Sequence, residues 1–263
     1  MSPPRPDPLE AARELVRAGE PLLVLLSGGG DSVCLLDVAV RLGAEVSALH
    51  VDHGLRESGD AEFCERLCRD LGVPLVVERI DLAGAPGNLM AAAREARYEL
   101  AERHAVGDYA TAHTASDQAE TVLYRLAVSP GRRALLGMAP RRGRLVRPLL
   151  AITREEVRAY CRERGLEWRE DPTNEDLRFA RARVRAEVLP ALRELNPAAE
   201  LNIAETAAQL REEAEVLDAT VTEALKRGQT PFSLRVLRGL PPALARLALR
   251  ELAGDAPVTR RDA

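Results

Sequence analysis

The sequence has few of the residues on which several classes of protein depend. A single lysine, Lys226, occurs in 263 residues and follows no glycine-rich turn, which excludes a lysine Schiff-base enzyme and a Walker A nucleotide site. The four cysteines include no C-x-x-C pair, so a disulfide scaffold is excluded and no zinc or iron–sulfur site is indicated. The longest aliphatic run, Leu22 to Leu26, is far shorter than the roughly 20 residues of a membrane span. Because the first residues also form no apolar leader, we expect a cytoplasmic protein without a membrane partner.

Charge is unevenly distributed along the chain. The 37 basic and 41 acidic residues give a net charge of −4, which argues against indiscriminate binding of nucleic acid. Residues 132–185 nevertheless hold 15 arginines and 8 acidic residues. This local excess of positive charge is compatible with contacts to phosphate or RNA, and a face of salt-bridged helices is the alternative.

Short apolar runs alternate with helical patterns through the first 112 residues. Buried strands are predicted at residues 22–26, 46–51, 75–80 and 109–112. Helices are predicted at residues 9–18, 33–42, 60–71 and 89–104. Because alternating strands and helices imply right-handed crossovers, we predict an α/β fold, a Rossmann-like parallel sheet with helices on both faces.

The second half of the chain begins with a helix-start signal. Thr153 followed by Glu156 is a capping box, which predicts a helix to about Arg164. A strand is expected at 146–150, a loop at 167–176, and helices at 179–195, 198–226 and 242–252. The Asn196-Pro197 pair marks a boundary, so we predict a catalytic domain over residues 1–195 and a small all-helical domain over 196–263. Because residues 259–263 complete no element, we expect this helical domain to be truncated.

The first predicted strand leads into Ser27-Gly28-Gly29-Gly30-Asp31-Ser32 and then into a helix. Consecutive glycines allow a tight turn and bring backbone N–H groups against a ligand, while the helix N-terminus adds about half a positive charge. The loop is therefore predicted to bind an anion. Asp31 would repel a phosphate unless a divalent cation lay between them, which suggests Mg²⁺. A plain glycine turn with a Ser or Asp cap is the alternative.

This loop resembles S-G-G-x-D-S, the signature that follows the first strand in the N-type ATP pyrophosphatases, or PP-loop family. Further segments are similar to the tRNA(Ile)-lysidine synthetases of that family, over about residues 20–190: 49–56, 93–98, 111–113 with 117–121, 147–150, 165–168 and 171–174. The resemblance implies an ATP-dependent ligase that joins L-lysine to the wobble cytidine of tRNA(Ile) with a CAU anticodon. The reaction would pass through an adenylated tRNA and release AMP and pyrophosphate. ATP with Mg²⁺ is the expected cofactor, and a homodimer is left open.

Three residues after the fourth predicted strand can act together. His113, Asp117 and Glu120 are spaced i, i+4 and i+7 around a strand end and the helix after it, so they can share one face over the glycine loop. The resemblance implies that Asp117 and Glu120 hold the amino groups of lysine and that His113 lies near the reacting phosphate. With Asp31, the predicted magnesium ligand, they form the predicted catalytic set. A helix-start charge at Asp117 and a solvated side chain at Glu120 are the alternatives.

Two further groups of residues are predicted to contact ligands. The ATP-binding group is Ser27, Gly28, Gly29, Gly30, Asp31, Ser32, His50 and Asp52, because the second strand ends where an adenosine would rest against the sheet. The group that contacts phosphate or tRNA is Arg94, Arg97, Arg181, Arg183 and Arg185. For His50 the alternative is a packed side chain, and for the arginines it is ion pairing on a solvated helix face.

The chain departs from the lysidine synthetase pattern at several positions: Met90, Thr114, Ser116, Val128 to Pro130, and Ala182. These departures keep a second class of function open, a degenerate, non-catalytic module that binds nucleotide or RNA. Another PP-loop enzyme that modifies tRNA, such as a cytidine thiolase, is the enzymatic alternative. Those enzymes usually carry a cysteine cluster beside the loop, and this chain has none.

Overall fold

A computed structural model describes residues 7–52, 59–80, 89–129, 131–170, 180–227, 239 and 241–253. The chain divides into two compact units, Met1–Ala207 and Ala208–Ala263. The division falls within the long helix α10 (Ala199–Arg227). Residues 53–56 and 171–174 of the family-like segments, and residues 254–263 at the chain end, lie outside the described residues.

The first unit is built on one six-stranded sheet with the strand order β3-β2-β1-β4-β6-β5. The strands are β1 (Pro21–Leu25), β2 (Glu45–Asp52), β3 (Leu75–Arg79), β4 (Asp108–Ala110), β5 (Arg141–Arg142) and β6 (Leu145–Val146). All neighbouring strands pair in parallel except β5 and β6, which form a short antiparallel hairpin. The predicted parallel sheet is confirmed, and the hairpin at its edge was not predicted.

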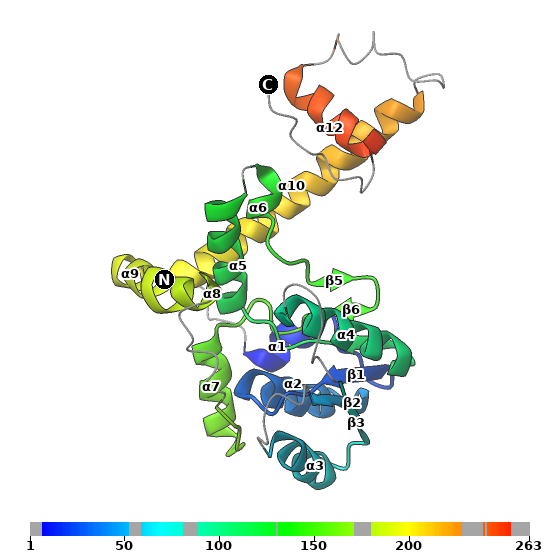
Figure 1. Ribbon diagram of the computed structural model, residues 1–263, viewed down its shortest axis with the longest axis vertical. Helices are drawn as coiled ribbons and strands as arrows, with labels where there is room; N and C mark the ends of the chain where they lie inside the picture. The colour runs from blue at the N-terminus through cyan, green and yellow to red at the C-terminus, as the bar shows by residue number, and fades with distance from the viewer. Residues whose placement is uncertain are drawn as a thin grey trace. The chain divides into compact units, whose positions relative to one another are not determined.

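Alternate residues of β1 face two different helical layers. Leu22, Val24 and Leu26 pack into one core with α2 (Gly30–Arg41), α3 (Asp60–Leu71) and α7 (Arg154–Glu163). Leu23 and Leu25 pack into a second core with α4 (Leu89–His104). Because a strand presents successive side chains to opposite faces, helices cover both faces of the sheet, as predicted (Figure 1).

Two elements end well before their predicted limits. The helix expected at residues 9–18 is α1 (Pro8–Ala12), after which the Leu15 amide donates to the carbonyl of Ala12 at 3.0 Å and the chain turns to bury Val16. The strand expected at 146–150 stops at Val146. Pro148 has no N–H with which to continue a ladder, so the chain leaves the sheet near this residue.

Local sequence signals explain where α7 starts and how the helix after it is shaped. The capping box at Thr153 and Glu156 is confirmed and starts α7. The helix predicted at 179–195 is a run of α8 (Ala180–Arg183), a π-helical turn at Val184–Val188 and α9 (Leu189–Leu195). Pro190 cannot donate a hydrogen bond to the preceding turn, and the Leu189 amide instead donates to Val184, the wider i→i−5 spacing of a π-turn.

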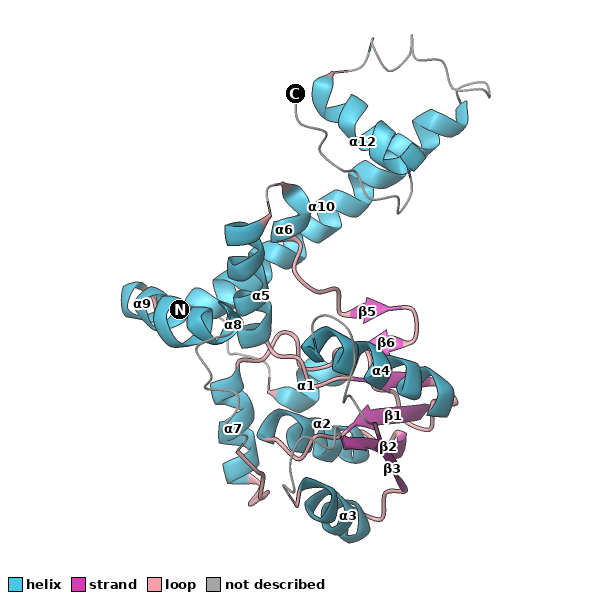
Figure 2. Cartoon of the chain, in the orientation of Figure 1, coloured by secondary structure: helices cyan, strands magenta, loops and turns pink. Residues whose placement is uncertain are grey.

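The described part of the second unit is helical except for Pro241 (Figure 2). It consists of the end of α10 and of α12 (Pro242–Ala253), with a small core that includes Val221 and Ala248.

Two more helices of the first unit, α5 (Ala115–Val128) and α6 (Arg132–Leu135), follow β4. In the residues that the structure describes, no helix is long and apolar enough to cross a bilayer.

Candidate active site

The glycine loop lies between β1 and α2, at the carboxyl end of the central strand. Gly28 has φ +83°, a conformation that favours glycine. A Cβ on Gly28 would lie 3.3 Å from the ring of Phe63, and one on Gly30 would lie 3.4 Å from the ring of Trp168. A Cβ on Gly29 would meet no atom closer than 3.6 Å. Two glycines therefore let the loop pack against the protein, and Gly29 leaves room for a ligand to approach the backbone.

Two serines fix the shape of this loop. The Ser32 hydroxyl donates to the Gly29 carbonyl at 2.9 Å and accepts from the Ser27 amide at 3.2 Å. The hydroxyls of Ser27 and Ser32 lie 3.1 Å apart. These hydrogen bonds hold the loop at the N-terminus of α2, where an anion is stabilised.

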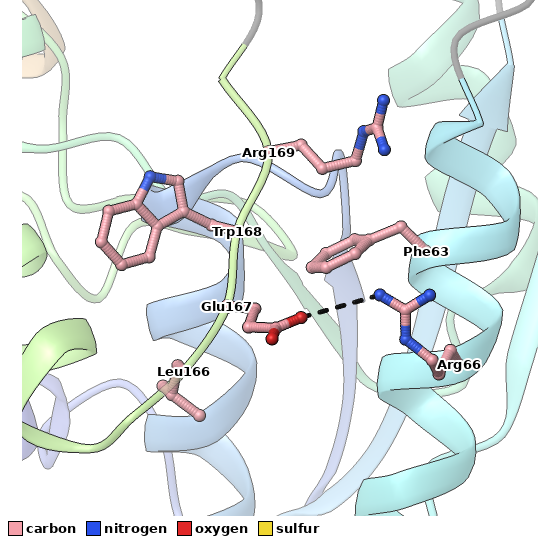
Figure 3. A pocket seen from close by; sticks show the side chains of 6 residues that line it. All are labelled: Phe63, Arg66, Leu166, Glu167, Trp168 and Arg169. Atoms are coloured by element: carbon pink, nitrogen blue, oxygen red, sulfur yellow. Dashed lines mark ion pairs between the residues drawn. The ribbon is translucent and has the colours of Figure 1, made fainter.

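A pocket of about 410 Å³ lies beside the loop, between α3 and the segment that follows α7 (Figure 3). Phe63 and Arg66 of α3 line one side, and Leu166 to Arg169 line the other. Its Arg66 and Glu167 form an exposed ion pair at 3.8 Å. The Arg169 amide donates to the Gly28 carbonyl at 2.9 Å. The pocket segment that contains Arg169 therefore holds the glycine loop in place.

The two predicted residues of the second strand have contacts within the protein. The Nδ1 atom of buried His50 lies 2.8 Å from the carbonyl of Leu26 and 3.5 Å from the Sγ atom of Cys64. These contacts match the alternative of a packed side chain and leave Nε2 as the ring atom that could meet a nucleotide. Asp52 forms an ion pair with Arg79 of β3 at 3.1 Å.

The N-terminus of α5 positions the next group of predicted residues. Thr114 and Asp117 form a capping box, in which the amide and hydroxyl of Thr114 donate to Asp117 Oδ2 at 2.9 and 2.8 Å. Glu120, one turn further on, is buried. The Nδ1 atom of His113 lies 2.8 Å from the Thr111 hydroxyl just before the helix.

Arg154 joins these carboxylates to the glycine loop. Its guanidinium lies 2.6 Å from Asp117, 3.2 Å from Glu120 and 3.5 Å from Asp31. Arg185 adds a second cation, with contacts to the two oxygens of Glu120 at 2.6 and 3.1 Å. The structure thus brings Asp31, Asp117 and Glu120 together, as the spacing predicted. The sequence analysis did not predict that two arginines would connect these carboxylates.

Burial and charge shift the proton affinities in this cluster. Burial raises the pKa of Asp31 to about 6, against the opposing effect of Arg154. Burial would also raise the pKa of Asp117, but Arg154, His113 and the Thr114 hydrogen bonds hold it below its usual value. Burial lowers the pKa of His113 to about 4, with Arg147 and other nearby cations acting in the same direction. At neutral pH the site therefore holds ionised Asp117 and an uncharged imidazole.

The predicted arginine group divides between the site and the surface. Arg181 donates to the Thr121 hydroxyl of α5, and Arg183 forms an exposed i, i+4 ion pair with Glu187 at 3.5 Å. Residues i and i+4 share one side of a helix and i+2 points away, which explains why Arg181 and Arg185 face α5 and Arg183 does not. On α4, the Arg94 guanidinium stacks on the Tyr98 ring at 5.3 Å, and burial lowers the pKa of Arg97.

Arg154 is the functional candidate that sequence reasoning missed. One signal was available: it is the first residue of α7, where the helix dipole disfavours a cation. A second unpredicted contact fixes its backbone, because the Ser116 hydroxyl accepts from the Arg154 amide at 3.1 Å and donates to buried Glu200 at 2.8 Å. Ser116, one of the departures from the family pattern, therefore has a structural role.

Asp31 is the residue that could hold Mg²⁺. Among the described residues, no group of three or more histidine, cysteine or acidic side chains is arranged as a metal site. Mg²⁺ is commonly held by one or two carboxylates together with substrate phosphates, and Asp31, part of the glycine loop, fits that role.

We expect His113 to remain uncharged through most of the acid range until a phosphate binds beside it. Its pKa of about 4 follows from burial and from nearby arginines, and added negative charge should raise it. An NMR titration of the four histidines, with His113→Gln for assignment, measures this directly. A His113 pKa near 6.5 without ligand, or one that ATP leaves unchanged, would contradict this account.

Comparison with known proteins adds independent findings. The profile of the PP-loop domain, ATP_bind_3, matches residues 9–192. A tRNA(Ile)-lysidine synthase of Thermus thermophilus is 43% identical over 244 residues, which cover 89% of this chain and 48% of that protein. One of Thermobifida fusca is 42% identical over 276 residues, 96% of this chain and 84% of that protein. The chain thus spans about half the length of the first relative and most of the second.

A solved structure shows the same fold. The U34-tRNA thiolase NcsA from Methanococcus maripaludis, described with its 4Fe-4S cluster, matches with a TM-score of 0.65 over 78% of this chain and 76% of that chain. The two sequences are 17% identical, so the likeness extends to the fold and not to the chemistry. All four cysteines of the present chain are buried and unpaired with one another as disulfides.

Proposed function

The chain belongs to the PP-loop family and, within it, to the tRNA(Ile)-lysidine synthases, and on this basis we propose that it ligates L-lysine to the wobble cytidine of tRNA(Ile) at the expense of ATP. The observation that carries the proposal is the cluster of Asp31, Asp117 and Glu120. It combines a residue of the ATP loop with two carboxylates suited to an amine. A module that only bound nucleotide would not need three carboxylates held together beside that loop.

The chemistry requires two displacements. In the first, the carbonyl oxygen of cytidine attacks the α-phosphorus of ATP, and pyrophosphate leaves. In the second, a lysine amine that has released its ammonium proton to solvent attacks the activated ring carbon through nitrogen, and AMP leaves with the former carbonyl oxygen. The backbone N–H groups of residues 27–32 would bind the phosphates, and Mg²⁺, when held by Asp31, would neutralise part of their charge.

The carboxylates would orient lysine for the second step. Asp117 is ionised at neutral pH because its pKa is held low, so it is suited to binding an ammonium group and not to removing a proton from it. Glu120 is buried, which strengthens its attraction for a cation. His113 is uncharged in the unliganded protein and would contribute a hydrogen bond near the reacting phosphate.

The RNA surface belongs to the same proposal. Residues 132–185 carry the excess of arginine, and Arg183 is exposed there. We assign contacts with tRNA phosphates to this segment, which includes Arg181, and to Arg94 and Arg97 of α4. The choice of the CAU isoacceptor, the division between a catalytic domain at 1–195 and a helical domain at 196–263, assembly as a homodimer and a cytoplasmic location remain further parts of the proposal.

The test is a reconstituted reaction with ATP, Mg²⁺, L-lysine and tRNA(Ile) transcribed with a CAU anticodon. We expect pyrophosphate release that depends on the tRNA, and lysidine in the digested RNA that depends on lysine. The matched control is the same tRNA with uridine at the wobble position, which lacks the cytidine. Pyrophosphate release without lysidine would contradict the ligase assignment, and a lack of both with tight ATP binding would favour the binding module.

A further inference from the structure

Arg154 fills the carboxylate site that the proposed function assigns to an amine. Each of its three guanidinium nitrogens meets a different carboxylate: Nη2 meets Asp117 Oδ1, Nη1 meets Glu120 Oε1, and Nε meets Asp31 Oδ2. An ammonium group carries three N–H donors and the same unit charge. Bound to Asp117 and Glu120, it could take over the charge pairing of the guanidinium, which would leave Asp31 for Mg²⁺.

Asp117 and Glu120 are held in place by contacts that do not involve Arg154. Asp117 Oδ2 accepts from the amide and hydroxyl of Thr114 at 2.9 and 2.8 Å. Glu120 is held by Arg185 through both of its oxygens. Both carboxylates therefore stay oriented when the Arg154 side chain leaves.

The Arg154 side chain can move without any change in the backbone. The capping box of Thr153 and Glu156 and the Ser116 hydroxyl fix the start of α7. The side chain itself is 19% exposed, so part of it already meets solvent. The dipole of α7 disfavours a cation in the first turn of the helix. The guanidinium of Arg154 is therefore held in place by the carboxylates and not by α7.

Buried carboxylates without a cation are costly, which explains why the unliganded site carries one of its own. We infer that Arg154 is a specificity-determining residue that occupies the ammonium subsite until the amine substrate displaces it. This inference rests on the proposed function and adds a selection step to it. A neutral amino acid of the same length cannot displace the guanidinium without leaving carboxylates unpaired, so only a cationic side chain completes the exchange.

Direct binding of labelled L-lysine to the full chain tests the exchange, by equilibrium dialysis with Mg²⁺ and a non-hydrolysable ATP analogue. Arg154→Gln removes the internal cation and keeps a side chain of similar reach, so we expect lysine to bind about tenfold more tightly than to the wild type. Arg154→Lys retains a cation and should bind lysine within a few-fold of the wild type. The matched control is Arg158→Gln, which removes a charge one turn further along α7 from an exposed pair with Glu170 and should leave lysine affinity unchanged.

Binding of the ATP analogue and the urea midpoint report whether each variant is folded. Equal or weaker lysine binding by folded Arg154→Gln would mean that Arg154 only stabilises the structure. That result would overturn the inference and leave the proposed function standing. A tenfold loss in Arg154→Lys would also overturn it, because the guanidinium would then assist lysine, and this arm holds even if the Gln variant is unfolded. If neither the wild type nor the variants bind lysine while all bind the ATP analogue, the proposed lysine specificity is wrong and the inference fails with it.

Discussion

Gly29→Val is expected to give a folded protein that no longer binds ATP. Gly29 has φ −73°, which any residue can adopt, and its Cβ position is 3.6 Å or more from every protein atom outside its neighbours. An isopropyl group there would instead occupy the space in which a phosphate must approach the loop amides. Loss of two or more charge-assisted hydrogen bonds, each worth about 1.5–3 kcal/mol, predicts a loss of affinity of at least about 100-fold.

Calorimetric titration with ATP and Mg²⁺ measures this loss, and circular dichroism with urea unfolding checks the fold. Gly29→Ala should give an intermediate loss. Gly30→Val is the instructive contrast, because its Cβ would press on the Trp168 ring at 3.4 Å and should lower stability as well as affinity. ATP affinity of folded Gly29→Val equal to that of the wild type would mean that phosphates do not bind at this loop.

Local patterns in the sequence predicted most of the elements around this loop. The apolar runs at β1 and β2 and the capping box at Thr153 depend on neighbours within a few residues. The strand–glycine–helix order also located the loop at the carboxyl end of a parallel strand. Because these patterns involve only residues close together in the sequence, they can be recognised without knowledge of the tertiary structure.

The pairing of charges across elements could not be predicted in the same way. Arg154 meets residues of α2 and α5 that lie 34 or more positions away, and Ser116 meets Glu200 across 84 positions. Arg185 was assigned to phosphate because it belongs to an arginine-rich segment, yet the structure places it on Glu120. Which of many arginines reaches a given carboxylate depends on helix packing, and composition does not contain that information.

The arginine partners also change how the carboxylates should be tested. Glu120→Gln would leave Arg154 and Arg185 without their shared buried partner, and removal of one member of a buried ion pair typically costs about 3–5 kcal/mol of stability. A loss of activity in that variant would therefore mix folding with chemistry. Asp117 is the better choice, because an asparagine oxygen can still accept the hydrogen bonds of Thr114 that cap α5.

Asp117→Asn is expected to leave ATP binding and tRNA adenylation largely intact and to slow the step that uses lysine. The substitution removes the charge that would hold an ammonium but keeps the cap of α5. Loss of a charged hydrogen-bond partner should cost about 2–4 kcal/mol of transition-state stabilisation, or roughly 30- to 1000-fold in rate. Single-turnover assays with ATP labelled in the γ- or α-phosphate separate pyrophosphate release from the later, lysine-dependent release of AMP.

Asp108→Asn is the matched control for this measurement. Asp108 lies in β4, and its two oxygens pair with Arg141 at 2.8 and 2.9 Å outside the cluster, so its loss should change neither step. If Asp117→Asn slowed adenylation while lysine use by preformed adenylated tRNA stayed normal, Asp117 would belong to the ATP or metal site. Arg154 would then link two parts of one nucleotide site, and the amine subsite would have to be sought away from α5.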